Sequence, residues 1–127
     1  MDVTVQRLEM SRVMIREATG STHVETFLAD FASLSQVRDL ANNLKTRRLD
    51  LLINNAGIGG GKSGEAKREL SQNGYELRFA VNYLAPFLLT HLLLPCLRRA
   101  APARIINVGS VGQSPIDFSD VMLERRY

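Results

Sequence analysis

The chain has 127 residues, of which 45% are hydrophobic and 23% charged, and its formal net charge is +3. This length predicts a single domain, and the composition excludes a wholly disordered chain. The single cysteine, Cys96, excludes an internal disulfide framework and a cysteine-only zinc site, so we expect a cytosolic protein without a metal centre. The basic residues are scattered pairs with no interleaved aromatic residues, a pattern that argues against nucleic-acid binding.

The predicted elements alternate between strands and helices. We expect strands at residues 3–6, 23–29, 49–53 and 104–108, and helices at residues 8–18, 34–44 and from about 71 or 73 to 99. Ser33 and Gln36 fit a capping box at the start of the second helix. The most apolar stretch, residues 84–97, is interrupted by His91 and Pro95 and is shorter than the roughly 20 residues of a membrane span, so we expect a buried helix.

Strands that alternate with helices predict an α/β fold with a mostly parallel sheet and helices on both of its faces. Ligands of such sheets bind beyond the carboxyl ends of the strands. Each predicted strand is followed directly by a polar or glycine-containing segment, at residues 6–7, 30–31, 54–57 and 107–110. We therefore expect a binding site along that edge of the sheet.

A glycine-rich segment at residues 56–63, AGIGGGKS, satisfies a loose form of the phosphate-binding P-loop. The residues that follow carry no apolar helical stripe, and no later predicted strand ends in an aspartate that could bind Mg²⁺. A P-loop nucleotide hydrolase is thus a distant alternative, and a glycine-rich loop beside a cofactor is the favoured interpretation.

Four motifs in chain order resemble the middle of a short-chain dehydrogenase/reductase. They are Asp30-Phe31, Asn54-Asn55-Ala56-Gly57, Ala80-Val81-Asn82 and Ile106-Asn107-Val108-Gly109-Ser110, and residues 74–90 are similar to the retinol-dehydrogenase-like branch. The resemblance implies a partial Rossmann-type three-layer fold that holds the second to fifth strands, with residues 111–127 as an irregular tail. It also implies an NAD(P)-dependent oxidoreductase that transfers hydride between a nicotinamide and a small alcohol or ketone.

The resemblance also implies roles for particular residues. Ser110 matches the catalytic serine that hydrogen-bonds the substrate oxygen, and Asn82 matches the catalytic asparagine that holds a proton-relay water. The long helix over residues 73–99 builds the dimer interface in much of this family, which implies a homodimer.

Six further residues match cofactor contacts of the family. Asp30 would accept from the adenine amino group, and the Phe31 backbone would contact the same ring. Asn54 would brace the sheet, while Ala56 and Gly57 would let the backbone approach the cofactor ribose. Arg7, at the end of the first predicted strand, matches a position where a basic residue favours the 2′-phosphate, so the resemblance favours NADP slightly over NAD.

The sequence also departs from the family pattern. No glycine-rich turn precedes Val3, and no lysine follows Lys67 to complete the Y-x-x-x-K motif. Tyr127 is either the catalytic tyrosine or part of an insertion. We therefore expect a truncated oxidoreductase that binds NAD(P)H poorly, is inactive alone and has low solubility because strand edges lack neighbours. The alternative is a non-catalytic remnant or interaction module.

Overall fold

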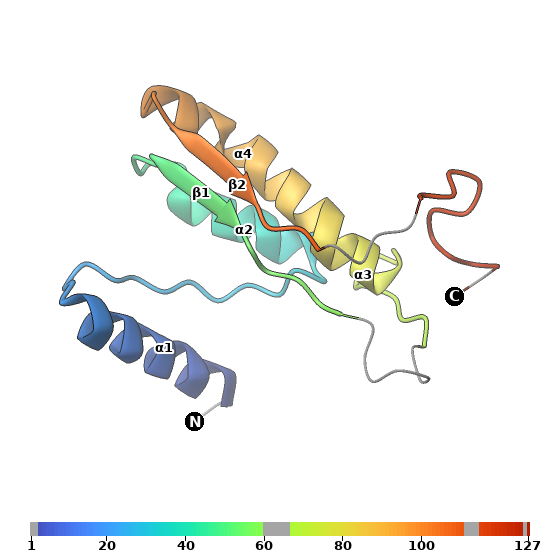
Figure 1. Cartoon of the computed structure of the whole chain (residues 1–127), viewed down its shortest axis with the longest axis horizontal. Helices are drawn as coiled ribbons and strands as arrows, with labels where there is room; N and C mark the ends of the chain where they lie inside the picture. The colour runs from blue at the N-terminus through green and yellow to red at the C-terminus, as the bar shows by residue number, and fades with distance from the viewer. Residues whose placement is uncertain (1–2, 60–66, 111–114, 126) are drawn as a thin grey trace.

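The computed structural model describes residues 3–59, 67–110, 115–125 and 127. Its packed part consists of α2 (Leu34–Leu44), one long helix and a sheet of β1 (Leu51–Asn54) and β2 (Arg104–Asn107), as Figure 1 shows. The long helix comprises α3 (Leu77–Phe79), the π-helical turn η1 (Ala80–Leu84) and α4 (Ala85–Arg99). A separate helix, α1 (Val3–Thr19), lies at the amino-terminal end.

The two strands pair in parallel, which confirms the predicted α/β class and two of the four predicted strands. Their register runs from Leu51 opposite Arg104 to Asn54 opposite Asn107. Two backbone bonds extend the ladder beyond the strands: Arg104 N–H donates to the Asp50 carbonyl, and Val108 N–H donates to the Asn54 carbonyl, both at 3.0 Å. The polar segments after β1 and β2 consequently lie at the same edge of the sheet.

The core lies between α2 and α4. Val37 and Ala41 of α2 meet Ala85, Leu89, Leu93 and Cys96 of α4, and Leu52 of β1 packs against this cluster. The apolar stripe predicted for residues 34–44 is therefore the buried face of α2. Cys96 is 1% exposed, and its thiol donates to the Lys45 carbonyl at 3.1 Å, as suits a small core residue.

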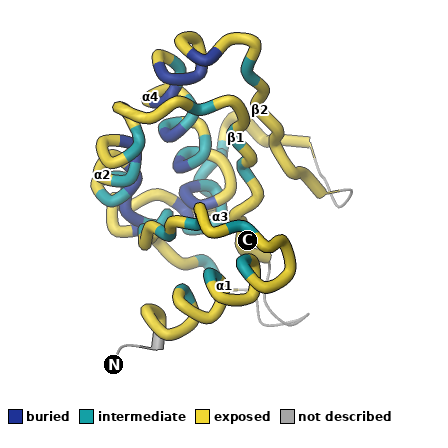
Figure 2. The backbone as a smooth tube through the Cα atoms, turned by 90° about the vertical axis from the view of Figure 1, so that its left-hand side faces the viewer, coloured by how far each residue is buried: buried dark blue, intermediate teal, exposed yellow. Residues whose placement is uncertain are grey.

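The sheet is covered on one face only, which corrects the expectation of helices on both faces for the part of the chain described. Figure 2 shows that α4 lies between the two strands on one side and α2 on the other. Leu51 and Ile53 are 47% and 53% exposed, and Ile106, which is paired with Ile53 on the same face, is also exposed. The accessible surface is 9720 Å², against roughly 6,700 Å² for a compact chain of this mass. Much apolar surface thus lacks a partner.

The strand predicted at residues 3–6 is wrong, because these residues form the first turn of α1. No strand lies beside them in the described part of the chain, and a β-branched run has no strand preference that is independent of a neighbour. Residues 6–10 are good helix formers, so local helix formation prevails. Met10 and Met14 of this helix are 63% and 65% exposed, since α1 does not pack on the core.

The strand predicted at residues 23–29 is also absent: the segment is extended but pairs with no strand among the described residues. Two hydrogen bonds of 2.7 and 2.6 Å tie the Glu25 carboxylate to the Arg47 guanidinium, which also lies over the Phe27 ring at 5.4 Å. Hydrogen bonding to Arg47 lowers the pKa of Glu25. This exposed ion pair holds the segment beside the end of α2.

The cap of α2 differs in detail from the predicted box. Ser33 is the N-cap residue, but its side chain makes no capping bond, and the first helical amide, Leu34 N–H, donates to Asn73 Oδ1 at 2.9 Å. Gln36 does reach back, but it accepts from Asp30 N–H rather than from Ser33. Asn73 is distant in sequence, so no local pattern could reveal this cap.

The long helix begins at Leu77, later than the predicted residue 71 or 73. Gly74 adopts a φ of +80°, a conformation that glycine tolerates best, and the chain turns there before Glu76 caps the helix. Pro86 has no N–H with which to close an α-helical bond to the Asn82 carbonyl, and it lies two residues after the end of the π-helical turn η1. The helix thus widens at Asn82.

Leu77–Arg99 is the one helix of the described residues whose length and mean hydropathy of 1.5 would let it cross a membrane. Helices at the core of globular proteins meet the same criteria. Its residues Ala85, Leu89 and Leu93 are buried against α2, so in this structure it serves as the core helix.

Candidate functional site

Asn54, the last residue of β1, ties three elements together where the strands end. Its side-chain N–H₂ donates to Asn107 Oδ1 of β2 at 2.7 Å and to Thr90 Oγ1 of α4 at 3.0 Å. Both donor hydrogens therefore have partners, and the carboxyl ends of β1 and β2 are fixed against the helix. This is the bracing contact expected of Asn54, whose part in cofactor binding stays a prediction.

Asn82 holds the turn that follows β1. Its Oδ1 accepts from Ile58 N–H at 2.8 Å and its Nδ2 donates to the Ile58 carbonyl at 2.9 Å, so the amide grips both backbone groups of one residue. A Cβ on Gly57 would lie 3.3 Å from Asn82 Oδ1, closer than most such contacts. The glycine leaves room here for the close approach of Asn82, a reason that the sequence pattern does not disclose.

A cavity of about 360 Å³ opens between these strand ends and the long helix. It is lined by uncharged side chains only: Asn54, Ala56, Asn82, Tyr83, Pro86, Phe87, Thr90, Asn107 and Val108. The strand ends contribute the amides of Asn54 and Asn107, and the long helix contributes both polar and aromatic side chains. Such a lining suits a flat, neutral group that exchanges hydrogen bonds along its edge.

The remaining predicted residues of this site lie at the same end of the sheet. Ser110 follows β2 and is exposed, and Ala56 lines the cavity. Asp30 ends the extended segment, where its carboxylate accepts from Ala32 N–H at 2.9 Å and from the Gln72 side chain at 3.2 Å. The Phe31 side chain packs against the core, which leaves its backbone for any contact with a ligand.

Arg7 is not brought to the site. It was expected at the end of a strand, but it is an exposed residue of α1, which does not pack on the sheet. Residues 3–6 have no neighbouring strand in the described part of the chain and form helix instead. Arg7 is therefore not at the end of a strand, where it was expected. A role in choosing NADP stays a prediction without geometric support.

Sequence reasoning singled out Asn82 but missed Pro86 and Thr90 of the cavity, which a helical spacing could have revealed. Asn82, Pro86 and Thr90 recur every four residues and line the cavity from one face of the helix. A neighbouring stripe, Phe79, Tyr83, Phe87 and His91, forms a stack with successive ring centroids 5.3, 6.0 and 6.2 Å apart. Tyr83 and Phe87 are 55% and 59% exposed, so this aromatic stack faces outward.

The segment considered as a P-loop is described only in part. Residues 56–59 are placed, and Ile58 is held by Asn82. Lys62 and Ser63, which would contact phosphate and Mg²⁺, lie outside the described residues. The distant alternative of a nucleotide hydrolase thus gains no support from this region.

Comparisons with known proteins place the chain in a family. The family model of the short chain dehydrogenases matches residues 1–117. Human retinol dehydrogenase 13 is 36% identical over 126 residues, which cover 96% of this chain and 37% of that protein. The chain belongs to the short chain dehydrogenase family, and it spans just over a third of the length of this relative.

Solved structures agree with the fold. The Pseudomonas aeruginosa RhlG/NADP active-site complex has a TM-score of 0.64 and 34% identity, over 81% of this chain and 41% of that one. A metagenomic short-chain oxidoreductase in complex with NADP has a TM-score of 0.66 and 26% identity, over 86% of this chain and 50% of that one. The resemblance to a partial Rossmann-type fold is therefore confirmed.

Proposed function

We propose that this chain is the central part of an NAD(P)-dependent oxidoreductase that acts on a small alcohol or ketone, with the cofactor's neutral end at the carboxyl ends of β1 and β2. The observation that carries the proposal is that two asparagine side chains fix this edge of the sheet by hydrogen bonds. Asn54 joins the strands to α4, and Asn82 joins the same helix to the turn at Ile58. A rigid polar rim beside an uncharged cavity is the kind of arrangement that orients a ring and excludes water.

The residues present fit part of a nicotinamide dinucleotide. The neutral cavity of about 360 Å³ suits a carboxamide and ribose hydroxyls, and the backbone at Ala56, which lines the cavity, and at Gly57 would hold them. When bound, a nicotinamide would supply or accept hydride. The chain's own part is to present amide and hydroxyl groups: Ser110 would hydrogen-bond the substrate oxygen, and Asn82 would keep the turn at Ile58 in place.

NADP is favoured over NAD only because two of the solved structures similar to this chain are NADP complexes, since Arg7 does not reach the site. We also propose a homodimer formed through the long helix, because the aromatic stack of Phe79, Tyr83, Phe87 and His91 faces outward.

A cytosolic location stays a prediction, and cell fractionation would test it.

The test is a titration of the ¹⁵N-labelled chain with NADPH, followed by amide chemical shifts. We expect weak binding, with dissociation constants well above the micromolar range, because an uncharged cavity holds only the neutral end of the dinucleotide. Shifts should be confined to residues 54–59 and 107–110, and Asn82→Ala should abolish them. Asn43→Ala, an exposed asparagine of α2, is the matched control and should behave as wild type.

The alternatives make different predictions in the same experiment. A non-catalytic remnant or interaction module would show no shifts at residues 54–59 with NADPH at millimolar concentration. A nucleotide hydrolase would respond to Mg-ATP instead and would release phosphate. Micromolar affinity for NADPH that survived Asn82→Ala would contradict the site proposed here.

A further inference from the structure

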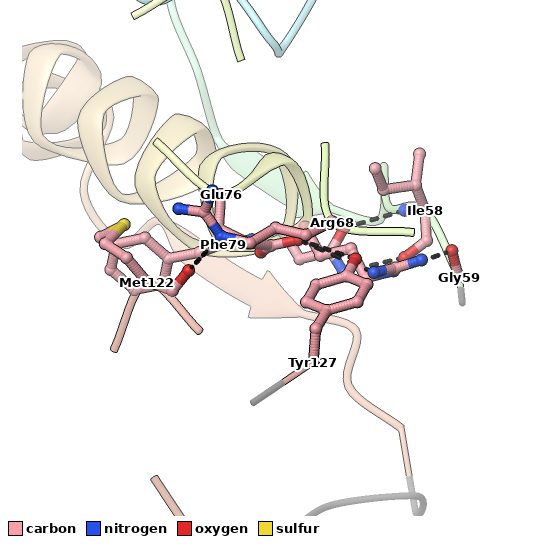
Figure 3. A network of polar contacts seen from close by, with 9 residues as sticks. Ile58, Gly59, Arg68, Glu76, Phe79, Met122 and Tyr127 are labelled. Carbon is pink, nitrogen blue, oxygen red and sulfur yellow. Dashed lines mark hydrogen bonds and ion pairs between the residues drawn. The ribbon is translucent and has the colours of Figure 1, made fainter. Parts of the chain in front are cut away.

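A second polar cluster lies outside the cavity, and the proposed function does not use it. Its centre is Glu76, which is only 2% exposed. One carboxylate oxygen accepts from Phe79 N–H at 2.7 Å and so caps the long helix, while the other accepts from the Tyr127 hydroxyl at 3.2 Å (Figure 3). Burial of a carboxylate is unfavourable unless its oxygens are hydrogen-bonded, which these contacts achieve.

Arg78 connects this cluster with the turn after β1. Its Nε donates to the Gly59 carbonyl at 3.2 Å, and its guanidinium lies 3.7 Å from Glu76 Oε1. The guanidinium also lies 5.0 Å from the centroid of the Tyr127 ring, within range of a cation–π contact. A single side chain thus touches the turn, the helix cap and Tyr127.

The segment that carries Tyr127 is docked independently at a second place. Arg68 donates to the Met122 carbonyl at 2.9 Å (Figure 3). Its guanidinium also lies 3.8 Å from the Glu124 carboxylate. Within the segment, the Asp120 carboxylate accepts from Glu124 N–H and Arg125 N–H at 2.8 and 3.0 Å, which closes a turn. Residues 115–125 therefore approach the start of the long helix as an ordered turn.

The same helix therefore holds two successive residues of the turn. Asn82 grips the backbone of Ile58, and Arg78, one helical turn earlier, holds the carbonyl of Gly59. Asn82 is fixed by its place in the helix. Arg78 depends on Glu76 and Tyr127 for its direction, because an arginine side chain has many rotamers when it has no partners.

We propose that Arg78 is a positioning residue of the turn at Gly57–Gly59, and that Glu76 and Tyr127 hold it in place. Docking of residues 115–125 and of Tyr127 thereby sets the conformation of the turn. The inference rests on the proposed function only for what the turn binds; the coupling itself is a property of these contacts.

The test measures hydrogen exchange of the Ile58 amide by NMR, because that amide bonds to Asn82 only while the turn is in place. Arg78→Met should raise the exchange rate of this amide about fivefold, as expected from losing the net stabilisation of one hydrogen bond. Tyr127→Leu should raise it about threefold through loss of the ring and hydroxyl contacts, and Arg78→Lys should restore part of the protection. Arg98→Met and Tyr75→Phe, which change residues outside the cluster, are the matched controls and should leave it unchanged.

Other amides separate coupling from general destabilisation. The Leu93 amide in the core should exchange at the wild-type rate in every variant. If Arg78→Met unfolds the chain, Tyr127→Phe and Glu76→Gln change single polar groups and give the same comparison. Unchanged Ile58 exchange in folded Arg78 and Tyr127 variants would overturn the coupling.

An NADPH titration of the same samples distinguishes the two proposals. Faster Ile58 exchange in Arg78→Met, without NADPH shifts in wild type, would support the coupling and reject the proposed cofactor site. NADPH shifts in wild type with unchanged exchange in Arg78→Met would do the reverse.

Discussion

Residues 30–110 and residues 3–29 are similar in composition but differ in what they pack against. In the first region, α2 and α4 bury a shared apolar face, and β1 and β2 supply each other's backbone partners. In the second, α1 exposes Met10 and Met14, and no strand formed by described residues pairs with the extended segment 23–29. One exposed ion pair, Glu25–Arg47, ties the second region to the first.

The difference shows that a helix and a strand depend on their surroundings to different degrees. The hydrogen bonds of α1 are internal, so it forms without packing on the core, whereas residues 23–29 could satisfy strand hydrogen bonds only with a neighbour. The apolar open face of β1 and β2 belongs to the packed region, but no other described element covers its side chains. Substitutions in the core, at the open sheet and in residues 3–29 should therefore differ in their effects.

The largest effect is expected in the core. Leu93 is fully buried between α2 and α4, so Leu93→Ala should lower the free energy of unfolding by about 2–5 kcal/mol. Met14→Ala, on the exposed side of α1, should change it by less than about 0.5 kcal/mol. Denaturant unfolding followed by circular dichroism measures both, and equal losses would mean that α1 is packed after all.

A smaller effect on stability, but a clear one on association, is expected at the open edge of the sheet. Ile53 is 53% exposed on β1, which pairs only with β2 among the described residues, so Ile53→Lys should reduce self-association and raise solubility. Ile15→Lys, which charges an isoleucine of similar exposure on α1, is the matched control. Sedimentation velocity gives the readout. Association unaffected by Ile53→Lys would assign it to the aromatic stack instead.

The smallest effect is expected at the Glu25–Arg47 pair. Because Arg47 lowers the pKa of Glu25 in the folded chain, the contact is fully present above the usual carboxyl value of 4.5 and is lost as the pH falls through the lowered pKa. Both side chains are exposed, so the pair contributes little to overall stability. Amide shifts of residues 23–27 should change on acidification and with Glu25→Gln, but not with Glu17→Gln.

The helix over residues 34–44 and the strands near residues 51–54 and 104–107 were predictable, because an apolar stripe or a short apolar run carries its own signal. The turn at Gly57 was recognised as a motif, but its reason was not, since the close approach of Asn82 involves residues 25 positions apart. The bond from Asn73 to Leu34 and the contact of Tyr127 with Glu76 span even longer separations. No local pattern contains them.

By itself the amino-acid sequence determined the family, the α/β class and the order of strand-end motifs, because these depend on residue types at short spacing. Tertiary structure alone decided that residues 3–6 join a helix, that one sheet face stays open, and that Asn82 and Arg78 hold adjacent residues of one turn. Strand pairing and side-chain contacts depend on which segments meet in space, and a linear pattern does not specify those meetings.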